Sequence, residues 1–308
     1  MSRVFSRTNQ LIIAAAARLG ARAEPLSATT TDYFLRLRHG DRAVIISKTR
    51  SPFLTQVAQS LSNNKRVSRD LLAAAGLPVP PDLLVDETGD PGDAAALAFL
   101  GEHQALVVKP NWGNRGAGLS APIRDAAALA RACARAQEGD LDEEALVEPF
   151  LPGANLRIAV IGGEAVAAAE IVRPRLRGDG RRSAREAVAA LNRDPRRTGW
   201  ERQGLVTLDR IDADEELAEH LAVHGLDVDA PLPAGFEIEL ISEEAEVIDR
   251  SEAIDPGWRS LAERACALLG VDVGGVDLRG PLDAFYEPPR AGADAWRRGA
   301  LLEVNVLP

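Results

Sequence analysis

The sequence lacks several features on which common protein functions depend. Only two of its 308 residues are cysteines, Cys133 and Cys266, and both stand in alanine-rich helical patterns without the spacing of a metal site or a disulfide framework. No stretch approaches the roughly eighteen apolar residues that a transmembrane helix needs. We therefore expect two buried, reduced cysteines, no membrane span and a cytoplasmic location.

Positive charge and histidine are scarce too. The 36 lysines and arginines face 46 aspartates and glutamates, so the formal net charge is −10. Nucleic acids and anionic membranes bind basic faces, so neither is expected as a main partner. The four histidines are scattered, and no Ser–His or Cys–His arrangement indicates a nucleophile on the protein.

Local clusters of arginine nevertheless occur between Arg173 and Arg197. Two interpretations of these clusters stay open. They are either a solvated loop or a patch that receives an acidic small substrate.

Helical and strand-like patterns are mixed along the chain, and its length predicts two or three lobes. Helical patterns cover residues 8–19, 52–75 (as two helices), 93–100, 125–138, 183–192 and 257–269. Strand-like patterns cover residues 33–37, 42–47, 105–108, 145–150, 155–170 (as a hairpin), 236–240, 275–278 and 301–306. The region from 173 to 240 is the most irregular.

The first chemical signal is the stretch from Ala105 to Ser120. Four apolar residues fit a buried strand that ends at Lys109, and Pro110 cannot donate a ladder hydrogen bond. Glycines at 113, 116 and 118 allow backbone amides to turn toward an anion, and Lys109 adds a positive charge. The pattern favours a phosphate-binding loop, with a plain glycine turn as the alternative.

A second signal comes from polar residues near strand ends. Glu303 and Asn305 are two positions apart on one strand, so their side chains share a face. Together with Asp277 they offer the hard oxygen ligands that Mg²⁺ prefers, although ordinary polar residues at a sheet edge would look the same. A strand-to-loop hinge at 147–151, followed by Asn155 and Arg157, is of the sort that contacts a nucleotide.

Taken in order, these segments resemble the ATP-grasp carboxylate–amine ligases, specifically the module shared by cyanophycin synthetases and the synthetase half of bifunctional glutathione synthetases. The resemblance covers nearly the whole chain. It rests on the segments at residues 64–69, 75–80, 107–110 with the loop that follows, 147–150 with Gly153 and Arg157, 178–180, 192–197, 275–277 and 303–305.

The resemblance implies an α+β ATP-grasp fold of three lobes, with ATP between two antiparallel sheets. It implies an N-terminal lobe at residues 1–63, a small ATP-grasp subdomain with the glycine loop at 64–150, and a large subdomain with substrate- and magnesium-binding elements at 151–308.

The same resemblance implies roles for individual residues. Lys109 and Arg157 would be catalytic, acting on the phosphates and the acyl-phosphate. Cofactor contacts would come from Lys65, Lys109, Asn114, Gly116, Gly118, Glu148 (near the adenine amino group), Phe150, Leu151 and Asn155 (near the ribose). Magnesium ligands would be Asp277, Glu303 and Asn305.

The implied reaction uses ATP and two Mg²⁺ ions, with Mn²⁺ as a possible substitute. A substrate carboxylate attacks the γ-phosphorus, and an amine then opens the acyl-phosphate to give an amide, ADP and phosphate. The partners would be small carboxylates and amines, and a homo-oligomer is possible. The alternative is a non-catalytic ATP-binding or scaffolding protein of the same fold.

Three departures from the family pattern stand out. Asn155 replaces the acid that usually holds the ribose hydroxyls, Arg175 stands where a histidine is common, and Trp112 adds bulk beside the glycine loop. The first of these predicts weaker nucleotide affinity, because an amide oxygen is a poorer acceptor than a carboxylate.

Overall fold

The computed structural model describes residues 7–26, 34–85, 94–112, 116–138, 144–197, 208, 210–240 and 245–306. The helices are α1 (Arg7–Arg18), α2 (Gln56–Asn63), α3 (Lys65–Ala74), α4 (Ala94–His103), α5 (Ala126–Gln137), α6 (Ala184–Leu191), α7 (Glu215–Val223) and α8 (Pro256–Leu269). The strands are β1 (Arg22–Pro25), β2 (Phe34–His39), β3 (Arg42–Ser47), β4 (Leu83–Val85), β5 (Leu106–Pro110), β6 (Ser120–Ile123), β7 (Ala145–Pro149), β8 (Ala154–Ile161), β9 (Glu164–Val172), β10 (Arg175–Arg177), β11 (Glu237–Glu239), β12 (Glu246–Asp249), β13 (Val273–Gly280) and β14 (Ala300–Asn305).

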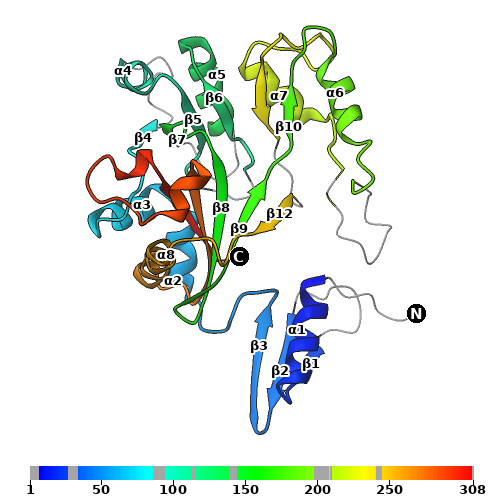
Figure 1. Ribbon diagram of the computed structural model, residues 1–308, viewed down its shortest axis with the longest axis vertical. Helices are drawn as coiled ribbons and strands as arrows, with labels where there is room; N and C mark the ends of the chain where they lie inside the picture. Colours follow the sequence, from blue (N-terminus) through cyan, green and yellow to red (C-terminus); the bar gives the residue numbers. More distant parts are fainter. Residues whose placement is uncertain are drawn as a thin grey trace.

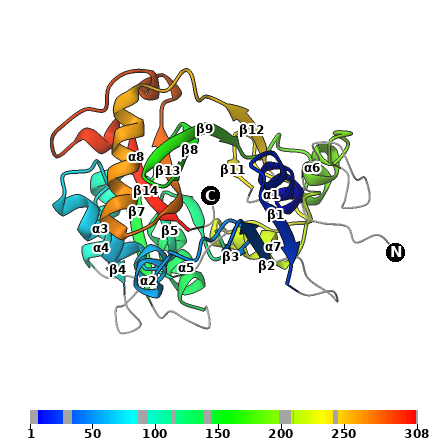
Figure 2. The ribbon, with the colours of Figure 1, turned by 90° about the horizontal axis from the view of Figure 1, so that it is seen from below.

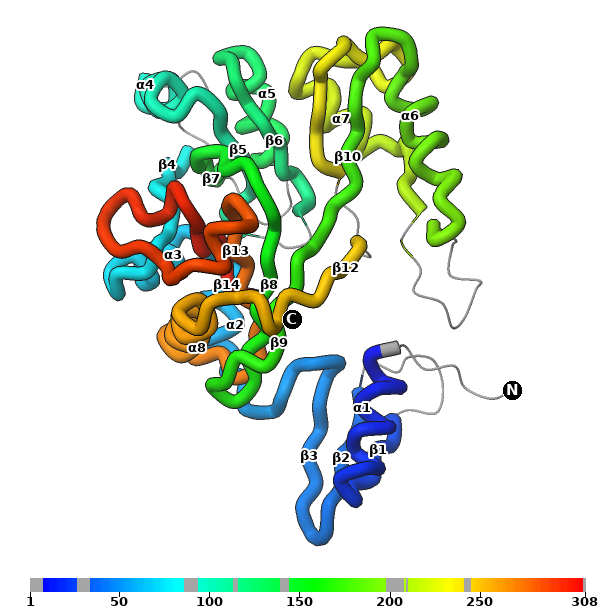
Figure 3. Tube along the Cα trace, in the orientation of Figure 1, coloured from blue at the N-terminus to red at the C-terminus, as the bar shows by residue number. Residues whose placement is uncertain are grey.

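The first lobe is a small antiparallel sheet, β1-β2-β3, with α1 beside it. This lobe lies at the bottom of the view in Figure 1, apart from the rest of the molecule. The tube view shows the chain that connects β3 to α2 (Figure 3). The predicted hairpin between residues 33 and 47 is confirmed, with a turn at Gly40, whose φ of 56° favours glycine.

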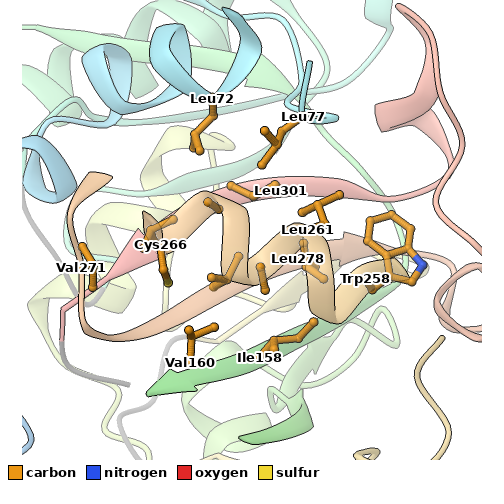
Figure 4. Close-up of a cluster of buried hydrophobic side chains, with 14 of the residues drawn as sticks. Leu72, Leu77, Ile158, Val160, Trp258, Leu261, Cys266, Val271, Leu278 and Leu301 are labelled. Atoms are coloured by element: carbon orange, nitrogen blue, oxygen red, sulfur yellow. The ribbon is translucent and has the colours of Figure 1, made fainter. Parts of the chain in front are cut away.

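The largest sheet has the order β12-β9-β8-β13-β14 and is antiparallel throughout. The predicted hairpin of β8 and β9 turns at Gly162 and Gly163, both with positive φ. Helix α8 runs along one side of β8, β13 and β14 (Figure 2), and its apolar side chains form the main core with them. Figure 4 shows this core, in which Trp258 and Cys266 of α8 lie near Ile158 and Leu278 of the sheet.

Helices α2 and α3 join the same core. Ala58 of α2 and Leu72 of α3 are buried in it together with Leu301 of β14. The predicted boundary between residues 63 and 64 thus separates two helices that share one core. Asn64 is the residue at which they meet, since its side chain caps α3 by accepting a hydrogen bond from the Val67 amide.

The second sheet, β4-β7-β5-β6, is also antiparallel and has its own core with α4 and α5. Cys133 of α5 is buried there, and burial raises the pKa of its thiol to about 11. Burial likewise raises the pKa of the Cys266 thiol to about 12. Both cysteines are free, as predicted.

The described residues between 174 and 240 (174–197, 208 and 210–240) form a further unit, which we name the arginine unit after its composition. It has a two-stranded sheet of β10 and β11, helices α6 and α7, and a separate apolar core. The predicted helix at 183–192 is α6, which begins with a capping box between Ser183 and Glu186. Helix α7 is a second helix in this region, for which the sequence analysis gave no pattern; its N-cap is Asp214, which accepts from the Leu217 amide.

Among the described residues, no helix is long and apolar enough to cross a membrane.

Candidate functional site

A cavity of about 1260 Å³ lies where the two antiparallel sheets, the arginine unit and the end of β3 meet. Most of the candidate residues from the sequence line it: Lys65, Lys109, Gly116, Glu148, Phe150, Leu151, Asn155, Arg157, Asp277, Glu303 and Asn305. Asn114 lies outside the described residues. Gly118 is close by, with φ 69°, and a Cβ there would come within 2.9 Å of the Pro110 ring, so only glycine fits.

Lys65 and Lys109 reach the cavity from different elements. Lys65 is the first residue of α3, and its Nζ donates to the carbonyls of Pro110 (3.2 Å) and Asn111 (3.3 Å) at the end of β5. Burial lowers the pKa of the Lys65 ammonium to about 8, against the opposing effect of Glu303. The two lysines are therefore held at the end of β5, where the glycine-rich segment begins.

Glu148 joins a buried ion network that the sequence did not reveal. Lys109 Nζ donates to Glu148 Oε1 at 2.9 Å, and the guanidinium of Arg69 pairs with the other carboxylate oxygen. Burial would raise the pKa of Glu148, but the charges of Arg69 and Lys109 lower it. Arg69 also donates to the Leu302 carbonyl at 3.2 Å, so it connects β7 of one sheet with β14 of the other.

Two neighbouring strands bring the candidate metal ligands together, and a third strand places Arg157 beside them. Asp277 on β13 lies directly opposite Glu303 on β14 and Arg157 on β8. The Asn305 amide donates to Asp277 Oδ2 (3.0 Å) and Glu303 Oε1 (3.1 Å), while Arg157 binds Asp277 through two hydrogen bonds of 2.6 and 2.8 Å. These contacts place both carboxylates and the carboxamide at one point of the cavity wall.

The charges around the two carboxylates set their protonation. Burial would raise the pKa of Glu303, but Lys109 and Lys65 lower it to about 2. Burial raises the pKa of Asp277, and the charge of Arg157 opposes that rise. No group of three or more His, Cys, Asp or Glu side chains suited to a metal occurs in the part of the chain that the structure describes, so a metal here depends on the Asn305 carboxamide.

Arg279 is a site residue that sequence reasoning missed. Its guanidinium binds Glu239 through two contacts of 3.0 Å, donates to the Asn155 side-chain oxygen and the Leu151 carbonyl, and lies 5.5 Å from the centre of the Phe150 ring. It therefore organises the hinge at which a nucleotide contact was expected. Its position two residues after Asp277, on the same face of the strand, is the signal that could have identified it.

Most side chains in the arginine-rich region are neutralised by nearby acids. Glu237 accepts from Arg175 (2.7 Å) and Arg177 (2.8 Å), and the same kind of pairing joins Arg182 to Asp179, Arg185 to Asp229 and Arg196 to Asp194. Only Arg173 and Arg175 of the predicted cluster line the cavity among the described residues. For most of the cluster, the solvated interpretation is therefore the better one.

The small first lobe also reaches the cavity, which the sequence did not suggest. Lys48 and Arg50, just after β3, are among the residues that line it. No local sequence pattern indicates that these two residues reach the cavity, because they follow an ordinary hairpin strand.

Comparisons with known proteins agree with the predicted resemblance. The chain is 29% identical over 293 residues to a cyanophycin synthetase of Crocosphaera subtropica, covering 94% of this chain and 32% of that protein. It is 30% identical over 286 residues to the glutathione biosynthesis bifunctional protein GshAB of Mannheimia succiniciproducens, covering 90% of this chain and 36% of the relative. It spans about a third of the length of these relatives. No family model matches the chain.

The fold is shared with a solved relative. A bifunctional glutathione synthetase from Pasteurella multocida superimposes with a TM-score of 0.58 at 24% sequence identity, covering 99% of this chain and 40% of that one. The predicted α+β ATP-grasp fold is confirmed.

Proposed function

Since the chain has the ATP-grasp fold and is similar to cyanophycin synthetases and bifunctional glutathione synthetases, we propose that it is an ATP-dependent carbon–nitrogen ligase. It joins a carboxylate, of an amino acid or peptide, to an amine through an acyl-phosphate and releases ADP and phosphate. The three-part division at residues 63/64 and 150/151 and a cytoplasmic location belong to the same proposal, as do small-molecule partners without nucleic acid or membrane.

One observation carries this proposal. Lys65, Lys109 and Arg157 line the same cavity as Glu303, Asp277 and Asn305, although these residues come from five separate elements. Cations for a triphosphate and oxygen ligands for its metal ion are the two things that phosphoryl transfer needs in one place. Phe150 and Leu151, at the hinge after β7, offer the apolar surface that an adenine ring requires.

The donor set fits Mg²⁺. Two carboxylates and a carboxamide are hard oxygen donors, and a half-turn of the Asn305 amide exchanges its nitrogen for its oxygen next to Asp277 and Glu303. A bound Mg²⁺ would supply charge neutralisation between the phosphates and the reacting carboxylate. We propose these three residues as its ligands, with one or two ions bound.

The residues of the chain would then act as follows. Lys65 and Lys109 hold the phosphates and offset their charge, so that an anionic carboxylate can approach. Arg157, placed beside Asp277, stabilises negative charge on the transferred phosphoryl group. Gly118 packs closely against the ring of Pro110, and this contact would hold the glycine-rich segment near Lys109. The segment would then limit the access of water to the activated acyl group. Arg173 would receive an acidic substrate group on the other side of the cavity, because Arg175 is already paired with Glu237 and Glu239.

The test is a product assay over a panel of carboxylates and amines with Mg²⁺ and ATP. We expect ADP and phosphate to be released only when a matching carboxylate and amine are both present. AMP and pyrophosphate as products would contradict the proposed chemistry. Thermal stabilisation by Mg·ATP without turnover on the whole panel would instead favour the non-catalytic alternative.

A further inference from the structure

Helices α5 and α7 belong to different units but lie side by side (Figure 1 and Figure 2). Helix α5 packs on the small sheet, whereas α7 belongs to the arginine unit. Arg131 of α5 donates to the Val223 carbonyl at the end of α7 (2.9 Å). The two units are therefore joined by polar contacts.

Arg135, one turn further along α5, makes the more informative contact. Its Nη1 donates to the Leu119 carbonyl (2.9 Å) and to the Ser120 hydroxyl (3.3 Å). The same guanidinium pairs with Glu219 of α7 at 3.5 Å, and only 8% of its side chain is exposed. One nearly buried cation thus holds the glycine-rich segment and α7 at the same time.

Both segments that Arg135 contacts are connected to the cavity. Leu119 follows the turn at residues 116–118 and directly precedes β6, and its own side chain lines the cavity. On the other end, α7 is fixed by buried Leu217 and Leu221 in the core that also holds β10 and β11. Those two strands carry Arg175 and Glu239 into the cavity wall.

A second contact supports the same connection. His220, one residue after Glu219, is buried, lines the cavity and hydrogen bonds with the backbone of Ala121 at the start of β6. Strand β11 also lies against β6. The arginine unit therefore touches the segment that follows the glycine turn at two successive points.

We propose that Arg135 is a positioning residue that couples the arginine unit to the glycine-rich segment at residues 116–120, so that a ligand bound against one restrains the other. In the proposed ligase this coupling would link the substrate side of the cavity to the phosphate side. The functional meaning rests on the proposed function, but the mechanical coupling can be tested without a substrate.

The test is hydrogen–deuterium exchange followed by mass spectrometry on the full chain, first without nucleotide. Arg135→Ala should raise exchange in residues 116–123 and 215–224 together, by about tenfold, because it removes a buried charged hydrogen bond. Glu219→Gln, which changes an exposed partner and leaves the core intact, should raise exchange in 215–224 in the same direction but less. Arg131→Ala is the matched control, since it cuts a bond between the same helices and should leave 116–123 unchanged.

The second half adds saturating Mg·ADP as the probe. In the wild-type protein, Mg·ADP should slow exchange both in residues 116–123 and in residues 215–224. In Arg135→Ala it should slow exchange in residues 116–123 only. Three results would each overturn the coupling. The first is that Mg·ADP protects only one segment in the wild type. The others are that Arg135→Ala leaves exchange without nucleotide unchanged, or that Arg131→Ala affects 116–123 as much as Arg135→Ala does. A wild-type protein that shows no response to Mg·ADP would contradict the proposed function, and the apo comparison would still decide the coupling. Unchanged exchange in α8 establishes that the variants are folded.

Discussion

Lys109 offers the sharpest test, because its side chain is both buried and placed on the cavity. We consider Lys109→Met, which keeps the apolar stem and removes the charge. Glu148 would lose the 2.9 Å hydrogen bond from Lys109 but would keep its ion pair with Arg69. The expected cost is therefore that of one charged hydrogen bond, about 2 kcal/mol, rather than that of a fully unpaired buried carboxylate.

The expected effect on ATP turnover is much larger than the effect on stability. A loss of about 2 kcal/mol lowers the melting temperature of a chain of this size by only about 4 °C, so the variant should stay folded at 25 °C. Removal of one preorganised positive group from a transferring phosphoryl group typically costs at least about a hundredfold in rate. ADP release should fall by that factor, and stabilisation by Mg·ADP should shrink as well.

A suitable control is Arg66→Met. The partly exposed Arg66 pairs with Asp82 at 2.7 Å, and Asp82 also lies 3.5 Å from Arg69 of the buried network. Arg66 does not line the cavity, so turnover should be nearly unchanged. The reasoning fails if Lys109→Met releases ADP within about fivefold of the wild-type rate. It also fails if Arg66→Met loses turnover to the same extent, because the effect would then come from the network as a whole.

Two further predictions concern charge at the cavity. The pKa of Lys65 is about 8 in the free protein, and a bound phosphate favours the charged form of the lysine. The affinity for Mg·ADP should therefore be constant below pH 8 and should fall by up to about tenfold for each pH unit above it. Calorimetry in buffers of different ionisation enthalpy should detect proton uptake near pH 8, and Lys65→Arg should abolish it; equal uptake in that variant would contradict the assignment. Asp277→Asn should raise the Mg²⁺ concentration needed for half-maximal nucleotide stabilisation by about tenfold or more, whereas Asp249→Asn, an exposed carboxylate of the same sheet, should not. Chelation with EDTA should remove the stabilisation in the wild type, and stabilisation that persists would argue against a metal site here.

The local parts of the site could be predicted from the sequence. The alternation of Glu303 and Asn305 on one strand is a consequence of strand geometry, and the structure shows both side chains in contact. The strand that carries Lys109 follows from a short apolar run, although it extends one residue further than predicted and includes Pro110. What periodicity could not provide is the register that places Asp277 opposite both Glu303 and Arg157, because pairing between strands 120 residues apart depends on the whole fold.

The sequence could not show ion pairs between residues that are far apart along the chain. Arg69 looks like a solvated residue of an amphipathic helix, yet it is buried between Glu148 and the Leu302 carbonyl. Arg177 looks like part of a basic patch, yet its partner Glu237 is 60 residues away. Composition within a window of the sequence cannot show either partner, because each partner lies far away in the sequence.

The distribution of these pairs has a consequence for how ligands would enter the cavity. Lys109 and Arg157 are each already paired with a carboxylate, Glu148 and Asp277 respectively, so a triphosphate arriving alone must compete with those acids for the cations. A divalent cation held by Asp277 and Glu303 would weaken the hold of Asp277 on Arg157 and free the guanidinium for a phosphate oxygen. Nucleotide and metal ion should therefore bind with positive cooperativity, and by thermodynamic reciprocity each should raise the affinity of the other by the same factor.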